Sequence, residues 1–324
     1  IYRKRMKVLI ITEANEKIAS GHLMESISLA TRLADMQIEY LLLINSDMPV
    51  VWKEKLAGLK YGEYIKSLEC GMDMIISEAI SNRYDVIITD VREITNEQVH
   101  SIKKVFKNRL ICIDEWGNRL LDCDYIVNNM LDQYYWNYFD SQAIVYAGPQ
   151  YLMLSEELKN YHRKEKCISD KISNVVISMG GVDSKNNSKK VVNVLKEIEN
   201  IDTINVVLGG GYLFKEELMS IIGNDKRFFI HQNINYIYDL FENADLAVCA
   251  GGNTMYELAG IGTPMIVLPT MPHEKRNGQA FERLGLCRVV DEITEKTIAG
   301  FDHGMRLEMS EKEKQLIDGM GLDR

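Results

Sequence analysis

The stretch from Ala244 to Pro269 constrains the fold most, because two short apolar runs flank a glycine turn and a helical pattern. Ala244–Val248 and Met265–Pro269 have the length and apolar content of buried strands. The residues between them have the spacing of a short helix that packs on a sheet, at Tyr256, Leu258, Ala259 and Ile261. A strand, a helix and a second strand in this order predict a parallel βαβ unit.

The turn in this stretch has the features of a nucleotide site. Gly251 and Gly252 allow the backbone to approach a ligand closely. We expect Asn253 or Thr254 to cap the helix, so that its first amides point outward and form an anion site. Glu257, one turn later, would repel a phosphate but could accept two hydrogen bonds from a ribose diol. An ordinary βα turn followed by a surface glutamate would have the same sequence pattern, because Gly-Gly alone is a weak motif.

Alternation of strands and helices extends over most of the chain. Further strands are predicted at Met6–Ile11, Tyr40–Ile44, Val86–Asp90, Leu110–Asp114, Cys123–Val127, Val175–Ser178, Ile204–Leu208 and Arg227–His231. Helices are predicted at Leu23–Leu33, Met72–Ser81, Lys189–Glu197, Phe214–Ile222 and Ser310–Asp318. This order predicts an α/β protein with doubly wound, Rossmann-like parallel sheets that bind ligands at the carboxyl ends of their strands.

A domain boundary is expected where the composition of the sequence changes. Residues Ser155–Asp170 are dense in charge and separate two strand–helix series of similar length. We therefore expect an N-terminal Rossmann-like domain over residues 1–155 and a C-terminal one over residues 168–300. A helical tail is expected over residues 301–324.

Composition limits the classes of partner. Of the 324 residues, 46% are hydrophobic and 26% are charged, which is typical of a soluble globular protein. A net charge of -9 argues against a nucleic-acid or membrane-surface partner. No apolar run has the length of a membrane span, and no secretory signal is visible.

The cysteine pattern indicates the redox compartment, and the first residue bears on whether the chain is part of a longer protein. Six cysteines without a C-x-x-C pair argue against a zinc site or a disulfide framework, and we expect a reducing, cytoplasmic compartment. The first residue is Ile1 and not Met, which raises the expectation that the chain is part of a longer multidomain protein or is processed.

His22 is the candidate catalytic residue. It follows Gly21, after the first strand and at the start of the first helix, where side chains face a ligand. A helix N-terminus lowers the pKa of a histidine, so we expect a neutral imidazole that acts as a base. A capping or structural histidine is the alternative.

Other polar residues lie at predicted strand ends. Asp90, Asp114 and Glu115 could bind sugar hydroxyls or could cap the helices that follow. Gly180-Gly181 is a second glycine turn that could approach the same diphosphate, and Asp183 is expected to begin the next helix. The histidines show no three-ligand metal spacing, and no metal is predicted.

These motifs together resemble the PseG-type UDP-sugar hydrolases of bacterial pseudaminic acid biosynthesis. The resemblance runs almost end to end and rests on Gly21-His22, Ile113-Asp114-Glu115, Gly148-Pro149-Gln150-Tyr151, Gly180-Gly181-Val182-Asp183, Cys249–Ala259 and Asp318–Arg324. It implies the GT-B architecture, shared with the peptidoglycan glycosyltransferase MurG, in which two Rossmann-like domains face a central cleft.

The resemblance also implies a reaction and a site. The family hydrolyses the sugar C1–O bond of a UDP-linked 2,4-diacetamido-2,4,6-trideoxyhexose and releases UDP, with His22 at the position of its catalytic histidine. Uridine and ribose contacts would come from Gly251, Gly252, Asn253 and Glu257, with Thr254, His273 and Asn277 as further substrate-binding residues. No magnesium ion or other cofactor is implied.

Three positions depart from the family pattern and keep other functions open. Glu25 stands where the family has arginine, Arg92 where it has tyrosine, and His273-Glu274 where it has Asn-Gln. The first two leave the sugar open and the third leaves the reaction open. The alternatives are a GT-B glycosyltransferase that transfers the sugar to an acceptor, and an inactive nucleotide-sugar-binding domain of a larger enzyme.

Overall fold

The computed structural model divides the chain into two compact units. Residues 6–14, 21–48, 50–64, 68–81, 83–117, 119–132, 136–234 and 236–324 are described. Unit 1 comprises Ile1–Glu156 with Met320–Arg324, and unit 2 comprises Glu157–Gly319. The residues expected to form a separate tail therefore divide between the two units. Most of the loop expected between Thr12 and Ser20 lies outside the described residues.

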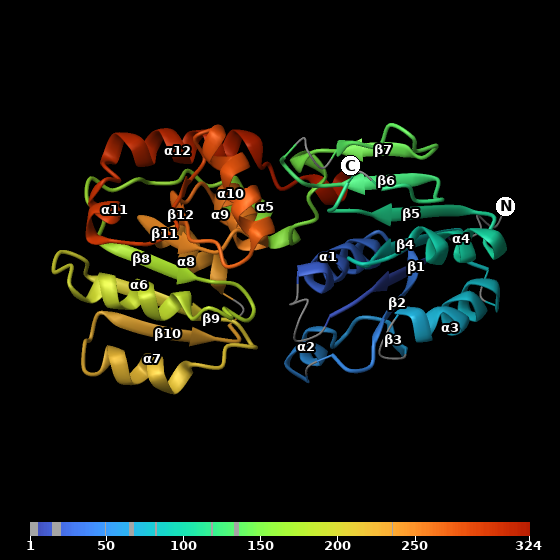
Figure 1. Cartoon of the computed structure of the whole chain (residues 1–324), viewed down its shortest axis with the longest axis horizontal. Helices are drawn as coiled ribbons and strands as arrows, with labels where there is room; N and C mark the ends of the chain where they lie inside the picture. The colour runs from blue at the N-terminus through green and yellow to red at the C-terminus, as the bar shows by residue number, and fades with distance from the viewer. Residues whose placement is uncertain are drawn as a thin grey trace. The chain divides into compact units, whose positions relative to one another are not determined.

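Unit 1 is built on a seven-stranded parallel sheet in the order β3-β2-β1-β4-β5-β6-β7 (Figure 1). Its strands are β1 Lys7–Thr12, β2 Glu39–Asn45, β3 Tyr61–Tyr64, β4 Val86–Asp90, β5 Arg109–Ile113, β6 Tyr125–Asn128 and β7 Ile144–Ala147. Its helices are α1 Gly21–Asp35, α2 Val50–Lys55, α3 Leu68–Ser81 and α4 Asn96–Val105. A 3-10 turn, η2 Pro149–Tyr151, precedes α5 Glu156–His162, and η3 Gly321–Asp323 ends the chain.

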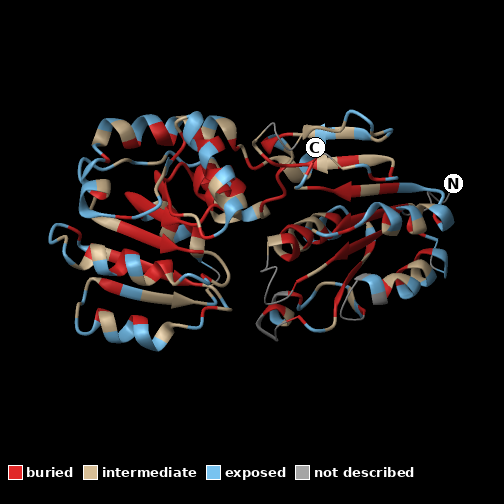
Figure 2. Ribbon diagram, viewed as in Figure 1, coloured by how far each residue is buried: buried red, intermediate tan, exposed pale blue. Residues whose placement is uncertain are grey.

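Both faces of this sheet are covered, because alternate residues of a strand point to opposite sides. Val8 and Ile10 of β1 belong to a buried cluster with Leu23 of α1. Leu9 and Ile11 belong to a second cluster, which includes side chains of α3 and α4. The inner strands are consequently buried along most of their length, whereas the helices are exposed on their outer sides (Figure 2).

Unit 2 has a six-stranded parallel sheet in the order β10-β9-β8-β11-β12-β13. Its strands are β8 Asn174–Ser178, β9 Thr203–Leu208, β10 Phe228–Gln232, β11 Leu246–Cys249, β12 Met265–Val267 and β13 Arg288–Val289. Its helices are α6 Asn187–Lys196, α7 Lys215–Ile222, α8 Ile237–Asn243, α9 Asn253–Ile261, α10 Pro272–Arg283, α11 Glu295–Ala299 and α12 His303–Leu316.

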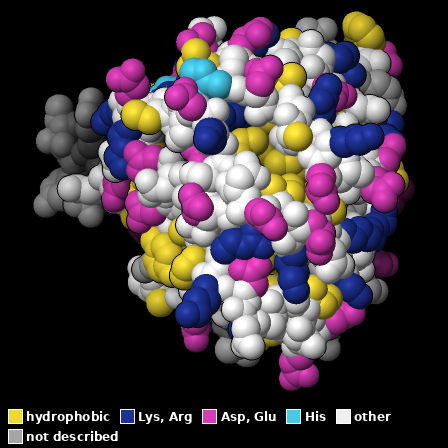
Figure 3. Space-filling model, turned by 90° about the vertical axis from the view of Figure 1, so that its left-hand side faces the viewer, with side chains coloured by type: hydrophobic (Ala, Val, Ile, Leu, Met, Phe, Trp, Pro, Cys, Tyr) yellow, Lys and Arg dark blue, Asp and Glu magenta, His cyan; other side chains and the backbone are white. Residues whose placement is uncertain are grey.

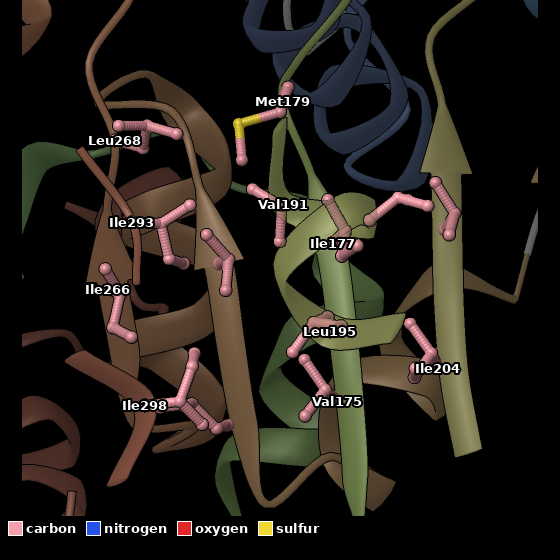
Figure 4. Packing of buried hydrophobic residues seen from close by; sticks show 14 of the residues in the cluster. Val175, Ile177, Met179, Val191, Leu195, Ile204, Ile266, Leu268, Ile293 and Ile298 are labelled. Atoms are coloured by element: carbon pink, nitrogen blue, oxygen red, sulfur yellow. The ribbon is translucent and has the colours of Figure 1, made fainter. Parts of the chain in front are cut away.

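The main hydrophobic core of unit 2 lies on one face of this sheet. Val175 and Ile177 of β8 pack with Val191 and Leu195 of α6 (Figure 4). Ile298 of α11 closes the same cluster. On the other side, α9 contacts β11, β12 and α12. Burial of both faces explains why these strands are short, nearly continuous apolar runs in the sequence.

The strand order confirms the prediction of two doubly wound α/β domains and locates their ligand-binding edges. In each sheet the order reverses once, between β1 and β4 in unit 1 and between β8 and β11 in unit 2. Open parallel sheets bind ligands outside the carboxyl ends of the strands at this point. The candidate residues therefore belong at the ends of these four strands.

Candidate functional site

His22 and Asp90 form a buried pair at the reversal point of unit 1. His22 is the second residue of α1, and Asp90 is the last residue of β4. The imidazole Nδ1 lies 2.7 Å from Asp90 Oδ1, and Ser26 Oγ donates to Asp90 Oδ2 at 2.9 Å. Asp90 is fully buried. Asp90 therefore orients the histidine. Its contact with a sugar hydroxyl, one of the two roles considered from the sequence, stays a prediction.

The second imidazole nitrogen faces a different carboxylate. Since Asp90 accepts a hydrogen bond from Nδ1, that nitrogen carries a proton and Nε2 is available for chemistry. Nε2 lies 3.7 Å from Oε2 of Glu115, whose side chain is 28% exposed. Glu115 follows β5 in the loop at its carboxyl end. The arrangement brings a histidine and a solvent-accessible carboxylate together where a substrate is expected.

The protonation state of His22 differs from the sequence-based expectation. Burial alone lowers its pKa, but the carboxylates of Glu115, Asp90 and Glu25 outweigh burial and raise the pKa to about 10. The helix N-terminus was expected to keep the imidazole neutral. The raised pKa is contrary to that expectation, because Glu115 and Asp90, distant in the sequence, and Glu25 on the same helix together stabilise the imidazolium.

Glu25, named above, and Glu13 are held in place by hydrogen bonds from other elements of unit 1. Glu25, on α1, is buried and accepts a hydrogen bond from Asn129 Nδ2 at 3.1 Å. Glu13, just after β1, accepts from the Arg92 amide at 3.1 Å, and burial raises the pKa of its carboxyl. Sequence analysis missed Glu13, Ser26 and Asn129. The spacing of Ser26, one helical turn after His22, could have indicated its role.

Asp114 organises the loop that carries Glu115. Its side chain is fully buried, forms an ion pair with Arg119 and accepts from the Tyr138 hydroxyl at 2.7 Å. It also accepts from the amides of Trp116 and Gly117. These contacts restrain both carboxylate oxygens, so Asp114 supports the loop that carries Glu115. Its contact with a sugar hydroxyl stays a prediction.

The glycine turns of unit 2 follow β8 and β11, on either side of its reversal point. A Cβ atom at Gly180 or Gly252 would meet no atom within 4 Å, so both glycines border open space. A Cβ at Gly251 would come within 2.3 Å of the Glu274 carbonyl oxygen, and the Gly181 carbonyl accepts from the Gly211 amide at 3.0 Å. Gly180 and Gly252 thus border space for a ligand, and Gly181 and Gly251 pack against neighbouring turns.

The N-terminus of α9 has no side-chain cap within the described part of the chain. The N-cap position is Gly252, and neither Asn253 nor Thr254 caps the helix, contrary to expectation. Both are partly exposed residues of the first turn. An uncapped helix start beside two glycine turns is the backbone arrangement that favours a phosphate.

Helix α10 approaches the same turn. Asn277 is buried, and its Nδ2 donates to the Gly251 carbonyl at 3.4 Å, whereas its Oδ1 has no partner among the described residues. His273 is the second residue of α10 and is half-buried. Glu274 accepts from the amides of Thr270 and Met271, so it holds the start of α10 in place.

Glu257 lies one turn into α9 and is half-buried. The Tyr238 hydroxyl, from α8, donates to its Oε1 at 3.1 Å and restrains the carboxylate. Sequence analysis missed Tyr238, which is distant in the chain. Asp183 was expected to begin the next helix. Instead, α6 begins at Asn187, and the two oxygens of Asp183 accept from the amides of Asn187 and Ser188, each at 2.8 Å.

The described residues contain neither a helix suited to cross a membrane nor a cluster of side chains suited to bind a metal ion. No described helix has both the length and the apolar character needed to cross a membrane. No group of three or more histidine, cysteine, aspartate or glutamate side chains in the same residues has a geometry that could hold a metal ion.

Comparison with known sequences gives one family match in unit 2 and similar proteins that align over most of the chain. Residues 174–316 match the family described as the glycosyltransferase family 28 C-terminal domain. The chain is 28% identical over 276 residues to the uncharacterized protein MJ1062 of Methanocaldococcus jannaschii, covering 81% of this chain but 55% of that protein. It is 23% identical over 269 residues to the spore coat polysaccharide biosynthesis protein SpsG of Bacillus subtilis, covering 78% of each.

Solved structures share the fold at low sequence identity. MurG of Acinetobacter baumannii superposes with a TM-score of 0.69 at 12% identity, over 98% of this chain and 97% of MurG. The glycosyltransferase VinC, solved in complex with dTDP, gives a TM-score of 0.62 at 12% identity, over 98% and 95%. The chain therefore has the GT-B fold of these glycosyltransferases, and most of its unit 2 matches the C-terminal domain of glycosyltransferase family 28.

Proposed function

We propose that the protein is a nucleotide-sugar hydrolase that cleaves the C1–O bond of a UDP-sugar, in nonulosonic acid biosynthesis of the pseudaminic type. The observation that carries the proposal is the His22–Asp90 pair at the reversal point of unit 1. A histidine whose Nδ1 is held by a buried carboxylate is a common arrangement in acid–base catalysis. The preferred substrate is a UDP-linked diacetamido-trideoxyhexose.

Unit 2 supplies the nucleotide site in this proposal. Gly180, Gly181, Gly251 and Gly252, with the uncapped start of α9 at Asn253 and Thr254, bind the diphosphate through backbone amides. Glu257, restrained by Tyr238, accepts hydrogen bonds from the ribose diol. Asn277 offers its unpartnered Oδ1 beside the same turn, and His273 lies one turn earlier on α10. The complex of VinC with dTDP supports nucleotide binding by this fold.

The charged state of His22 changes its role in the mechanism. Because the carboxylates raise the pKa of His22 to about 10, the imidazolium is the favoured form at pH 7 and a neutral base is disfavoured. We assign to the imidazolium the stabilisation of negative charge on the departing UDP. Glu115 accepts a proton from water, whose oxygen forms a bond to C1 as the C1–O bond to the diphosphate breaks.

A glycosyltransferase is the second candidate. The family 28 match and the SpsG relative favour it, since the same groups would act on an acceptor hydroxyl in place of water. An inactive nucleotide-sugar-binding domain is the third, and the 55% coverage of MJ1062 is compatible with it. Only the hydrolase would release UDP and free sugar in the absence of an acceptor.

Phosphorus NMR of a panel of UDP-sugars, incubated with the protein and no acceptor, tests the proposal. Release of UDP with free sugar is expected, and His22→Asn should reduce the rate at least about 100-fold. His100→Asn is the matched control, because His100 pairs with Asp122 on the surface. Binding of UDP-sugars without turnover would contradict the hydrolase. Full activity of the His22 variant would contradict the assigned site.

A further inference from the structure

An open cavity lies at the amino-terminal ends of β8 and β9, away from the glycine turns of unit 2. Its volume is about 660 Å³. Apolar side chains form its inner surface, at Ile172, Ile198, Ile201, Ile298, Ala299 and Phe301. Figure 3 looks onto this end of unit 2 and shows hydrophobic side chains gathered among acidic and basic ones. We propose that this cavity docks a basic, aliphatic peptide segment of another protein, a role beyond the proposed hydrolysis.

The charges around the cavity select the occupant. Four exposed carboxylates line it, at Asp170, Glu197, Glu199 and Glu295, against the exposed cation Lys171. Excess negative charge repels phosphate-rich partners such as nucleic acid or an anionic lipid surface. Lysine and arginine side chains fit instead, because their aliphatic stems cover apolar surface while the charged ends reach the carboxylates.

A buried guanidinium supports the wall of the cavity. Arg306 is 1% exposed, and its Nη2 donates to the carbonyls of Ser169 at 2.7 Å and Asp170 at 3.1 Å. These bonds fix the backbone just before Lys171, which lines the cavity. Because the guanidinium is buried, the exposed carboxylates and not Arg306 set the charge that an occupant meets.

The cavity is preformed, which lowers the entropy cost of binding. Arg227 Nη2 donates to the Lys196 carbonyl at 3.0 Å, and its Nη1 donates to the carbonyls of Ile198 and Ile201. Its position is in turn held by Asp225. These bonds hold the segment between α6 and β9, which forms one wall of the cavity.

The test measures the fluorescence anisotropy of a labelled peptide that alternates lysine and leucine while the full chain is titrated into it. The triple variant Glu197→Lys/Glu199→Lys/Glu295→Lys should weaken binding at least tenfold. Ala299→Trp, which fills the cavity without changing charge, should also weaken binding. The control is Glu216→Lys/Glu311→Lys, which makes four of the triple variant's six unit changes in net charge at exposed carboxylates outside the cavity and should leave affinity nearly unchanged.

Several outcomes would overturn the proposal. Equal binding by the triple variant and the control pair would show only general attraction to an acidic protein. Equal binding of a peptide that alternates glutamate and leucine would identify an anion site at Arg306. Self-association in sedimentation that the triple variant abolishes would make a second copy of the chain the occupant. UDP release by the same variants is measured separately, so a failure of the hydrolase leaves this test intact.

Discussion

At the scale of single residues, the surroundings of a histidine and not its partner alone determine its chemistry. Two histidine–aspartate pairs among the described residues have nearly equal lengths, His22–Asp90 at 2.7 Å and His100–Asp122 at 2.6 Å. The side chains of the first pair are 8% and 0% exposed, whereas those of the second are 64% and 45% exposed. Exposed pairs are screened by water and contribute little, so burial distinguishes the His22–Asp90 pair from the His100–Asp122 pair.

Replacement of Asp90 tests this conclusion. Asp90→Asn removes one of the carboxylates that raise the pKa of His22 from 6.5 to about 10, so we expect that pKa to fall. In the wild type, UDP release should persist to about pH 10, where the imidazolium is lost. In Asp90→Asn, the rate should fall about 100-fold or more and decline at lower pH. NMR titration of the His22 ring and pH–rate profiles measure both effects.

The control for this experiment is Asp122→Asn, which removes the exposed partner of His100. It should change neither the His22 titration nor the rate. An Asp90 variant that kept both the wild-type pKa and the wild-type pH profile would contradict the role assigned to Asp90.

At the scale of elements, glycine stands at positions 251 and 252 for two different physical reasons. Gly251 must lack a side chain because the carbonyl of Glu274, in α10, occupies the place of a Cβ atom. Gly252 borders open space and has a φ of -100°, which any residue can adopt. Packing therefore explains the first glycine, and access for a ligand explains the second.

Two alanine substitutions separate these reasons. Gly251→Ala should destabilise unit 2 by about 1–3 kcal/mol, because a methyl group cannot fit against backbone. Gly252→Ala should leave stability within about 0.5 kcal/mol but weaken UDP binding, since its methyl group enters the proposed phosphate space. Thermal unfolding and calorimetric titration with UDP measure the two effects. Unchanged UDP affinity in a stable Gly252 variant would remove this turn from the site.

At the scale of the whole molecule, unit 2 contains a buried carboxyl group without a hydrogen-bond partner among the described residues. Glu313, on α12, is fully buried, and neither carboxylate oxygen has a partner among the described residues. Burial raises the pKa of Glu313 well above 4.5, although the charge of Lys166 opposes the shift. Burial likewise lowers the pKa of Lys166 to about 8. Glu313 is thus retained as a neutral acid inside the domain.

This carboxyl group makes stability depend on pH. The unfolded chain releases the Glu313 proton above about pH 4.5 while the folded protein keeps it, so stability should fall as pH rises above 4.5. Glu313→Gln should remove that decline and raise the unfolding temperature relative to wild type increasingly between pH 5 and about 6.5. This range lies below the titration of Lys166. A constant difference between the two proteins over this range would show that Glu313 is ionised when folded.

Much of the fold was predictable because local apolar patterns reflect burial on both faces of a sheet. Val86–Asp90 was predicted with the bounds that β4 has, and the turn after β11 was recognised from its glycines. The edge strands β3 and β7 were missed. Tyr61–Tyr64 contains a glycine and a glutamate, and Ile144–Ala147 is apolar but has only four residues, which are partly or fully exposed. Edge strands owe their pairing to a neighbour more than to their own composition.

The site was predictable only as far as residue type and position on an element. The sequence indicated that His22 starts a helix and that Asp90 ends a strand, because both follow from local pattern. Their contact joins residues 68 positions apart, and Glu115 comes from a third element. The charge on His22 depends on the summed field of these carboxylates in a buried place. Electrostatic interaction depends on distance in space, so folding alone could turn the expected neutral base into an imidazolium.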